Sequence, residues 1–566
     1  MDINKRSILW IVFAVSLVIL WNNWMISTGK PSMFSPAPAK PAATAAAPAT
    51  GSVPAPAATA ATGAAATPGA EAPAAPAPIK TEVVTITTDV MRIDINTLGG
   101  TIQRLELLKH NDGTEQKKNQ VLFRQEGKHV YLGETGLVGA ASPLPNHQTP
   151  FVAKPGARML NDANQLQLVL EAEQGGVKLV KTFTFKKGDY VVDVQHDVTN
   201  VSAAPLSPQL YLQLKHDGWE PEDSSWLNPK FIAPTIYTPE TKYTKYEFKQ
   251  IEKDAQWMAE NPGKPTPAEH AKKSSDGWFA ITQHFFVSAF VPQEKLSRDI
   301  FTKREGDNLY SVGVVQPLGT VAPGATVTNK AKLYVGPQDT ETLEKVAEGL
   351  DLVKDYGMLA VVARPMWWAM DQIHSVVGNW GWTIIAFTVL IKLLFFPLSA
   401  ASFRSMAKMK LVTPKMTAIR ERYKGDPQKM NQAMMELYKT EKINPLGGCL
   451  PILVQMPVFI ALYWVLNASV EMRGAPWALW IHDLTKPDPY FVLPVLYAIS
   501  MYITTRLNPQ PADPMQAKMM MFMPIAFSVM FFFFPSGLVL YWVVNNLLSI
   551  AQQWVITKKF ETGPAK

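Results

Sequence analysis

A lysine stands near the middle of an otherwise apolar stretch, residues 380–398, whose composition is typical of a membrane-spanning helix. At the centre of a bilayer this residue, Lys392, would cost roughly 2.5–3.5 kcal/mol on insertion scales, so it needs water or a polar partner. Thr388 lies four residues before it and Ser399 lies seven residues after it, so the three side chains would share one helical face. An ammonium group held there can attract an anionic segment.

Two further apolar segments also carry polar side chains. Gln455 lies within residues 446–466, and the segment 538–556 contains polar residues spaced by four, four and three, namely Tyr541, Asn545, Ser549 and Gln552. That spacing places the four on one face of a helix. If the polar faces converge, they line a hydrated groove in the inner-leaflet half of the bilayer. The alternative is that Gln455 and Asn545 simply hydrogen-bond between helices.

The elements that must position these residues form a predicted helical membrane domain in the C-terminal third of the chain. Its five apolar segments are residues 380–398, 446–466, 490–505, 519–534 and 538–556. Segments of 16 residues are shorter than the roughly 20 that span a bilayer, which implies a locally thinned membrane. Before them, residues 359–377 form an amphipathic helix that either lies on the bilayer surface or packs on the preceding domain.

The distribution of charge predicts the orientation of these segments. Residues 399–443 hold ten basic and four acidic side chains, whereas residues 468–489 hold two basic ones. The positive-inside rule places the first stretch in the cytoplasm, together with residues 506–518 and the basic tail 558–566. With a cytoplasmic N-terminus, six crossings also return the C-terminus to the cytoplasm.

The cytoplasmic stretch is predicted to be a helical hairpin. Residues 402–423 and 428–442 have helical composition, and a Lys-Gly-Asp-Pro turn separates them. Basic charge suits a ribosome, RNA or anionic lipid, and methionines adapt to varied apolar partners. The alternative is a solvated hairpin whose charges only set the topology. The candidate partner contacts are Arg404, Lys408, Met409, Arg420, Arg422, Met430 and Met434.

The N-terminal region predicts a membrane anchor and a tether. Lys5 and Arg6 precede an apolar run, residues 8–20, that extends to tryptophans and has no clear cleavage site, so an uncleaved transmembrane helix is expected. Residues 31–80 contain 21 alanines and 11 prolines, which is typical of an extended flexible linker.

Residues 81–350 predict one β-rich domain outside the cytoplasm. Alternating apolar and polar residues, separated by glycine turns, indicate an antiparallel sandwich of many strands, without a helix before about Thr340. Among the histidines of this domain, four lack metal-ligand spacing and are interpreted as surface residues that are solvated or hydrogen-bonded: His196, His216, His270 and His284.

Composition excludes several classes of protein. The chain has 566 residues, 47% of them hydrophobic and 18% charged, with a net charge of +7, so it is not a disordered chain. Its single cysteine, Cys449, excludes an intramolecular disulfide and a cysteine-based zinc finger. A phosphate-binding Gly-x-x-x-x-Gly-Lys-Ser/Thr loop does not occur, so ATP is not implied. We expect neither a cofactor, a metal nor an enzymatic activity.

Several short motifs together resemble the YidC/Oxa/Alb family of membrane-protein insertases, over essentially the whole chain. They are Gly378-Asn379-Trp380-Gly381, Ser405-Met406-Ala407-Lys408-Met409, Asn444-Pro445-Leu446-Gly447-Gly448-Cys449, Gln455-Met456-Pro457, Ala478-Leu479-Trp480-Ile481-His482-Asp483-Leu484, Asp513-Pro514-Met515-Gln516 and Phe534-Pro535-Ser536-Gly537-Leu538-Val539-Leu540-Tyr541. The resemblance implies a five-helix core, an N-terminal anchor and a periplasmic β-supersandwich.

The resemblance also implies a site and partners. The family has an arginine where this chain has Lys392, which keeps the charge but loses the bidentate fork. Thr388, Gln455, Tyr541 and Trp542 would line or abut the groove. The implied partners are nascent membrane proteins, the Sec translocon, ribosomes with signal-recognition components, and anionic lipids, but not DNA.

The expected function is therefore insertion and chaperoning of inner-membrane proteins, alone or with the Sec translocon, in the bacterial inner membrane. The alternatives are a secondary transporter with a polar site at the midplane, and a membrane-tethered periplasmic protein acting on carbohydrate. The predicted organisation is an anchor (1–28), a linker (29–80), a β-sandwich domain (81–350), an interfacial helix (351–378), a five-helix core (379–557) containing the hairpin (400–443), and a basic tail (558–566).

Overall fold

The computed structural model describes residues 81–112, 118–139, 143–219, 232–264, 267–441, 450–508 and 514–562. The predicted anchor (1–28) and linker (29–80) lie outside the described residues. So do residues 444–449 and 513 of the family motifs, and the end of the tail, 563–566.

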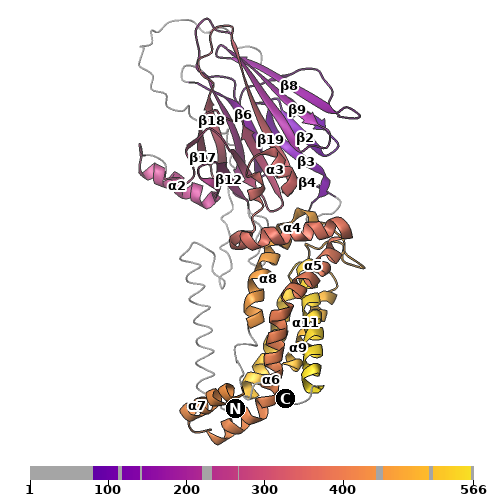
Figure 1. The fold of residues 1–566 in the computed structure, drawn as a ribbon. Helices are drawn as coiled ribbons and strands as arrows, with labels where there is room; N and C mark the ends of the chain where they lie inside the picture. The colour runs from indigo at the N-terminus through magenta and orange to yellow at the C-terminus, as the bar shows by residue number, and fades with distance from the viewer. Residues whose placement is uncertain are drawn as a thin grey trace. The chain divides into compact units, whose positions relative to one another are not determined.

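The N-terminal part of the described chain contains two antiparallel sheets (Figure 1). The first sheet has the order β1-β2-β3-β6-β11-β18-β17-β14, with β4 paired to β3 and β5 paired to β6. Its strands are β1 (Val83–Thr87), β2 (Met91–Asn96), β3 (Thr101–Asn111), β4 (Asn119–Val121), β5 (Arg124–Glu126), β6 (His129–Val138), β11 (Gln209–Asp217), β14 (Lys273–Ser274), β17 (Arg298–Gly306) and β18 (Leu309–Pro317).

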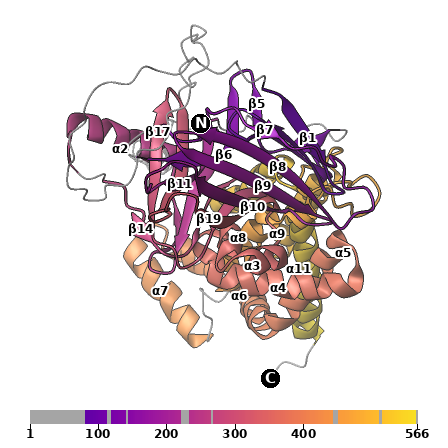
Figure 2. The same ribbon diagram turned by 90° about the horizontal axis from the view of Figure 1, so that it is seen from above.

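The second sheet has the order β13-β12-β15-β16-β19-β10-β9-β8-β7. Figure 2 shows β8, β9 and β10 of this sheet side by side. Its strands are β7 (Val152–Ala153), β8 (Gln165–Gln174), β9 (Val177–Lys186), β10 (Val191–Asn200), β12 (Ala233–Thr238), β13 (Lys242–Lys245), β15 (Trp278–Thr282), β16 (Phe286–Pro292) and β19 (Thr326–Pro337).

Alternation along the strands builds the core of this sandwich. In β9, Val177, Leu179, Phe183 and Phe185 are buried, and the residues between them are partly exposed, except for buried Lys181 at the same inward-facing parity. Inward-facing side chains of both sheets form one apolar cluster, which is the core expected of packed antiparallel sheets. The predicted β-sandwich is therefore confirmed.

One helix interrupts the strands, and the expectation of a strand-only region before Thr340 was wrong. Helix α2 (Phe248–Glu260) buries Ile251 and Asp254, and it packs on β17. Phe248 stacks on Tyr310 of β18, with ring centroids 5.1 Å apart. The helix buries few apolar residues, but Phe248, Ile251, Ala255 and Met258 recur at helical spacing, so this amphipathic pattern could have predicted it.

Short helices connect the sandwich to the amphipathic helix. They are α3 (Thr340–Val346), η1 (Leu350–Val353) and η2 (Gly357–Leu359), and they lead into α4 (Ala360–Val377). Helix α4 matches the predicted amphipathic helix within one residue, and it packs against the later helices α5 and α8. Its position relative to a bilayer surface stays a prediction.

The motif Gly378-Asn379-Trp380-Gly381 makes the corner after α4. Gly378 has a φ of 70°, which suits glycine at a helix end, and its N–H donates to the carbonyl of His374. The Asn379 side chain then caps α5 by accepting from the N–H of Trp382 at 3.1 Å. A Cβ atom at Gly381 would overlap Trp477, so the small residue allows this close packing.

The remaining helices form the predicted helical core. They are α5 (Trp380–Leu394), α6 (Phe396–Arg422), α7 (Pro427–Thr440), α8 (Leu450–Ala468), α9 (Val492–Leu507), α10 (Pro514–Ser528) and α11 (Ser536–Thr562), with the short turns η4 (Val470–Met472) and η5 (Val529–Phe532). Helix α11 packs against α5, α6, α8 and α9, and Figure 1 shows α5, α9 and α11 alongside one another.

The prediction of a single helix over residues 380–398 was wrong at its C-terminal end. The chain breaks at Phe395, and α5 and α6 are bent by 67°. Phe395 has a φ of −91° and a ψ of 9°, and a proline follows it at 397 near the start of α6. Proline is favoured in the first turn of a new helix and disfavours helical continuation before it, so the break lies where the sequence allows it.

Length and hydropathy identify one candidate membrane span, formed by two helices together. Within the described residues, none of the helices taken singly is both long and apolar enough to count as a spanning candidate, whereas the bent pair α5 and α6 qualifies when taken together. Many large apolar side chains are exposed on these helices, including Leu390, Leu394, Leu496 and Phe522. Exposed apolar surface of this extent indicates an apolar environment or partner.

Candidate functional site

The predicted polar residues of α5 and α11 meet. The ammonium nitrogen of Lys392 donates a hydrogen bond to the hydroxyl of Ser549 at 2.7 Å. The Ser549 hydroxyl donates in turn to the carbonyl of Asn545 at 2.8 Å. Lys392 is 7% exposed, and among the described residues no carboxylate lies within ion-pair distance of it. A buried cation with a neutral partner is a strong electrostatic attractor for an incoming anion.

The predicted polar residue of α8 also reaches α11. The Gln455 side-chain amide donates to the Asn545 side-chain oxygen at 2.6 Å. This contact is the interhelical hydrogen bond that the sequence left open as the alternative role for the two residues. Together the contacts link three helices through Lys392, Ser549, Asn545 and Gln455.

The other candidate residues of the groove have different surroundings. The Thr388 hydroxyl donates to the carbonyl of Ile384 in its own helix at 2.6 Å, and Thr388 is buried. Tyr541 is also buried, and its ring contacts Trp542 at a centroid distance of 6.0 Å. The indole N–H of Trp542 is buried without a partner among the described residues. Ser399 lies beyond the break, on α6, so it does not continue the helical face of Lys392.

Two polar contacts on a neighbouring face of α11 were not predicted from the sequence. The Asn546 amide donates to the Ser500 hydroxyl on α9 at 3.2 Å. One further contact joins the Gln553 amide to the Asn508 side-chain oxygen at 3.1 Å. Asn546 and Gln553 are seven residues apart and therefore share a helical face. That spacing is the signal in the sequence that could have predicted a second polar stripe.

The helical hairpin presents its basic residues to the surroundings. Arg404, Lys408 and Arg422 are exposed, and Arg420 is half-buried. The predicted methionines Met409, Met430 and Met434 are half-buried, whereas Met435 and Leu411 are more exposed. A side-chain cap by Asp426 begins α7, accepting from the N–H groups of residues 428 and 429 at 3.1 Å each.

Three of the four predicted surface histidines are buried, so that interpretation was wrong for His196, His216 and His270, whereas His284 is half-buried. Tertiary packing encloses them between the sheets and α2, which a single sequence does not reveal. Burial, with Lys181 nearby, lowers the pKa of His196 from 6.5 to about 3. Burial also lowers the pKa of His216 to about 4 and that of Lys181 from 10.5 to about 7. These histidines are neutral at physiological pH.

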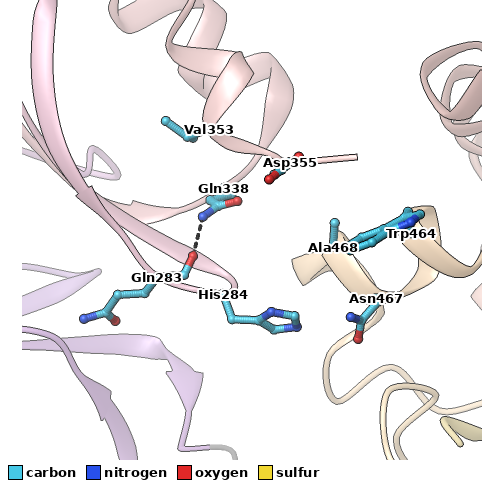
Figure 3. Close-up of a pocket in the computed structure, with 8 residues that line it drawn as sticks. All are labelled: Gln283, His284, Gln338, Val353, Asp355, Trp464, Asn467 and Ala468. Carbon is cyan, nitrogen blue, oxygen red and sulfur yellow. Dashed lines mark hydrogen bonds between the residues drawn. The ribbon is translucent and has the colours of Figure 1, made fainter. Parts of the chain in front are cut away.

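Residues of the sandwich and of α8 enclose a small cavity (Figure 3). It is lined by Gln283, His284, Gln338, Val353, Asp355, Trp464, Asn467 and Ala468. The Gln338 amide donates to the carbonyl of Gln283 at 2.6 Å, and this bond closes one side. At about 10 Å³ the cavity has room for one water molecule, so it is not a site for a larger ligand. Among the described residues, no group of His, Cys, Asp and Glu is arranged to hold a metal ion.

Two family models cover the described chain almost completely. The model described as the YidC periplasmic domain matches residues 83–369, and the model described as a 60Kd inner membrane protein matches residues 372–563. The first contains the sandwich and most of α4, and the second contains the helices that carry Lys392, Gln455 and Ser549.

Curated relatives match over the full length. A membrane protein insertase YidC of Herminiimonas arsenicoxydans is 57% identical and covers 100% of both chains, and one of Cupriavidus necator is 54% identical and covers 100% of this chain and 99% of the relative. A crystal structure of an active YidC insertase is 18% identical with a TM-score of 0.38, covering 84% of this chain and 92% of that chain. A galactose mutarotase related enzyme from Lactobacillus acidophilus is 9% identical with a TM-score of 0.30, covering 45% and 97%. The chain therefore belongs to the YidC family of inner-membrane protein insertases, whose periplasmic-domain model its β-sandwich matches.

Proposed function

We propose that this chain inserts proteins into the inner membrane by receiving a client's polar segment at the Lys392 cluster. The observation that carries the proposal is a buried ammonium group among apolar helices, with a serine hydroxyl as its partner. Moving a polar tail through hydrocarbon leaves backbone groups unsatisfied, at a cost of several kcal/mol each. A polar cluster between helices reduces that cost part of the way across.

The chemistry of the cluster favours acidic client tails. Lys392 supplies a positive charge, and the amides of Gln455 and Asn545 supply donors and acceptors for a hydrated backbone. A lysine binds a carboxylate as a point charge rather than through a planar fork, so its contacts with passing tails are short-lived. Thr388, Tyr541 and Trp542 would border the path at its apolar side.

Release would follow from apolar burial. A client's apolar segment moves from the polar cluster into lipid along the exposed leucines of α5. The transfer free energy of each methylene group buried in lipid is favourable by roughly 0.8 kcal/mol. A client segment of about 20 apolar residues is enough to drive the step without a nucleotide.

The hairpin of α6 and α7 would receive clients from the cytoplasm. Its exposed Arg404, Lys408 and Arg422 suit ribosomal RNA or anionic headgroups, and Met435 and Leu411 suit apolar segments. The topology that fits these roles has the hairpin and both termini in the cytoplasm, and the Sec translocon and the signal-recognition system as further partners.

The test is insertion of a small single-span client by the purified protein in liposomes, scored by protection of the client's tail from protease. Three clients are compared that differ only in the tail, which carries two acidic residues, two amide residues or two lysines. Lys392→Ala should slow insertion of the acidic-tailed client by roughly tenfold, and Lys392→Glu should slow it further while sparing the lysine-tailed client. Lys392→Arg should retain insertion.

The matched control is Lys128→Glu, a charge reversal at an exposed turn of the sandwich. It should insert all three clients at the rate of the unmodified chain. Equal insertion of the acidic-tailed client by Lys392→Ala, Lys392→Glu and the control would remove Lys392 from the mechanism.

A further inference from the structure

The loop between α8 and α9 presents an exposed leucine in a tight turn. The N–H of Ile481 donates to the carbonyl of Ala478 at 3.1 Å, which closes a β-turn over residues 478–481. A second bond, from the N–H of Trp477 to the carbonyl of Ile481 at 3.0 Å, supports the same turn. Leu479 occupies the first central position of the turn, and its side chain is left outside the packed helices, with 81% of the residue exposed.

The backbone of Leu479 adopts a conformation that is rare for an exposed leucine. Its φ is 55°, whereas the next residue, Trp480, does not have a positive φ. This combination is typical of a type II′ turn, whose first central residue is usually glycine. The conformation is strained for a residue with a Cβ atom. In water a leucine at this position would add strain without any packing, so the turn indicates an apolar environment for the side chain.

Hydrogen bonds hold the loop beside the ends of two helices. The Asn379 side-chain amide, at the start of α5, donates to the carbonyl of Pro476 at 3.0 Å. At the start of α11, the N–H of Gly537 donates to the carbonyl of Leu484 at 2.9 Å. The loop therefore lies level with the first turns of α5 and α11, and these contacts maintain the strained conformation of Leu479.

Exposed aromatic side chains flank the turn on both sides. Trp477 contacts Trp382 of α5, with ring centroids 5.8 Å apart, and Trp382 is exposed. Trp480 contacts Tyr490, just before α9, at a centroid distance of 6.3 Å, and Tyr490 is also exposed. Residues 474–481 contain no charged side chain. Tryptophan and tyrosine are enriched where acyl chains meet headgroups, so these residue types favour a lipid interface.

The exposed apolar surface continues from the loop along the helices. Two exposed stripes each have the spacing of a single helical face, by seven and four residues on α5 and by four and three residues on α9. They are Trp382, Val389 and Leu393 on α5, and Val495, Ile499 and Tyr502 on α9. In an inner-membrane protein such faces contact acyl chains, so the loop stands at the end of a lipid-facing surface.

We propose that the α8–α9 loop anchors the helices in the outer leaflet, with Leu479 inserted about 5–10 Å into the boundary of headgroups and acyl chains. The sandwich supports this choice of leaflet, because the periplasmic-domain model ends at residue 369, shortly before α5 begins at this end of the helices. Trp382 and Tyr490 would fix the depth on either side of the turn. This role goes beyond the insertion mechanism and does not depend on the Lys392 cluster.

The experiment is electron paramagnetic resonance of a nitroxide at residue 479 in liposomes of phosphatidylethanolamine and phosphatidylglycerol. Cys449→Ala removes the native thiol of the full chain, and Leu479→Cys provides the labelling site. Oxygen concentrates in hydrocarbon, whereas a polar nickel chelate stays in water, so the ratio of the two collision rates reports the surroundings of the label. This ratio at residue 479 should be roughly fivefold higher than at a site in water.

The matched control is Lys295→Cys in the same background. Lys295 is exposed on the sandwich and has a φ of 61°, so its label has a similar backbone conformation but lies in water. Tyr490→Cys should give a high ratio like that of residue 479. Client insertion by each labelled chain verifies that it is folded. Equal ratios at residues 479 and 295 in active chains would overturn the proposal.

Two further measurements distinguish lipid from a protein that covers the turn. The ratio at residue 479 should stay unchanged when the chain is diluted in lipid and when a client is added. A ratio that falls on dilution would assign the surface to a second copy of this chain. A ratio that is low without client and rises with it would assign the surface to the client, and either result would overturn the proposal.

Discussion

The ammonium group of Lys392 on α5 lies 2.7 Å from the hydroxyl of Ser549 on α11, and it donates a hydrogen bond to it. An ammonium group has three N–H donors, so this bond leaves donors for water or for a client carboxylate. The Ser549 hydroxyl donates its own hydrogen bond to the carbonyl of Asn545, which orients its oxygen as an acceptor toward Lys392.

This relationship predicts opposite outcomes for two substitutions of Ser549. Ser549→Ala removes a neutral acceptor and should change insertion of an acidic-tailed client by about twofold or less. Ser549→Asp places a carboxylate against the ammonium, forming an ion pair that competes with the client, and should slow insertion by about tenfold. Initial rates of tail protection in liposomes measure both effects.

A control for the added charge is Ser207→Asp, at an exposed position of the sandwich. It should leave the rate unchanged. A Ser549→Asp variant that inserts acidic-tailed clients as fast as this control would contradict an electrostatic role for Lys392.

The bond between Gln455 and Asn545 should stabilise the packing of α8 on α11 modestly. Hydrogen bonds between membrane helices average about 0.6 kcal/mol in double-mutant cycles and reach about 1.7 kcal/mol. We expect a coupling energy in this range from Gln455→Ala, Asn545→Ala and the double variant. Reversible unfolding of the full chain in mixed micelles measures it, and additive single effects would show that the contact contributes nothing.

Removing only the lysine from the ion pair of Lys354 and Glu471 should destabilise the folded chain. Lys354 is buried, its ammonium lies 3.0 Å from Glu471, and it also lies 3.9 Å from the centre of the Trp367 ring. Lys354→Met leaves the Glu471 carboxylate, whose side chain is 20% exposed, without its cation, so the free energy of unfolding should fall by about 2–3 kcal/mol.

The double variant Lys354→Met with Glu471→Leu provides the comparison. It removes both charges together and should recover most of the stability lost by the single substitution. Thermal unfolding of the full chain measures the three proteins, and a double variant less stable than Lys354→Met would contradict this account of the pair.

The buried histidines should make the sandwich less stable in acid. His196 and His216 have pKa values lowered by burial to about 3 and about 4, below the ordinary value of 6.5. As the pH falls below about 6.5 the unfolded chain binds protons that the folded chain does not, so stability falls with decreasing pH between about 6.5 and 4. The expected loss is on the order of 2 kcal/mol for each histidine by pH 4.5.

Thermal unfolding of the full chain in nanodiscs between pH 7 and 4.5 measures this slope. His196→Gln should reduce the slope, because the variant has one buried imidazole fewer to titrate. The control His482→Gln replaces an exposed imidazole and should keep the slope of the unmodified chain. Identical slopes for all three proteins would exclude His196 as a source of the acid sensitivity.

Several elements followed directly from local patterns in the sequence. The strands alternate apolar and polar residues, and the helical hairpin has a Gly-Asp-Pro turn whose Asp426 caps α7. Glycine and asparagine at 378 and 379 end one helix and begin the next. Such features depend on the conformational preferences of adjacent residues, which a single sequence contains.

Other features were not predicted from the sequence, or depend on packing between distant parts of the chain. The break at Phe395 directs α6 away from α5, so Ser399 leaves the face of Lys392 although its spacing fits that face. Helix α2 is placed by Phe248, which stacks on Tyr310 of a strand far away in the sequence. A cavity beside α4 is lined by residues between 339 and 372 and by Glu471, a separation that local periodicity does not span.

The sequence by itself determined the apolar segments, the charge of the hairpin, the β-rich domain and the presence of a lysine where a charge is expensive, because these are properties of composition and spacing. Only the tertiary structure decided that Ser549 partners Lys392, that Gln455 partners Asn545, and that His196, His216 and His270 are buried. The physical reason is that a hydrogen bond depends on the distance between two particular atoms, and helix packing sets that distance to within an ångström.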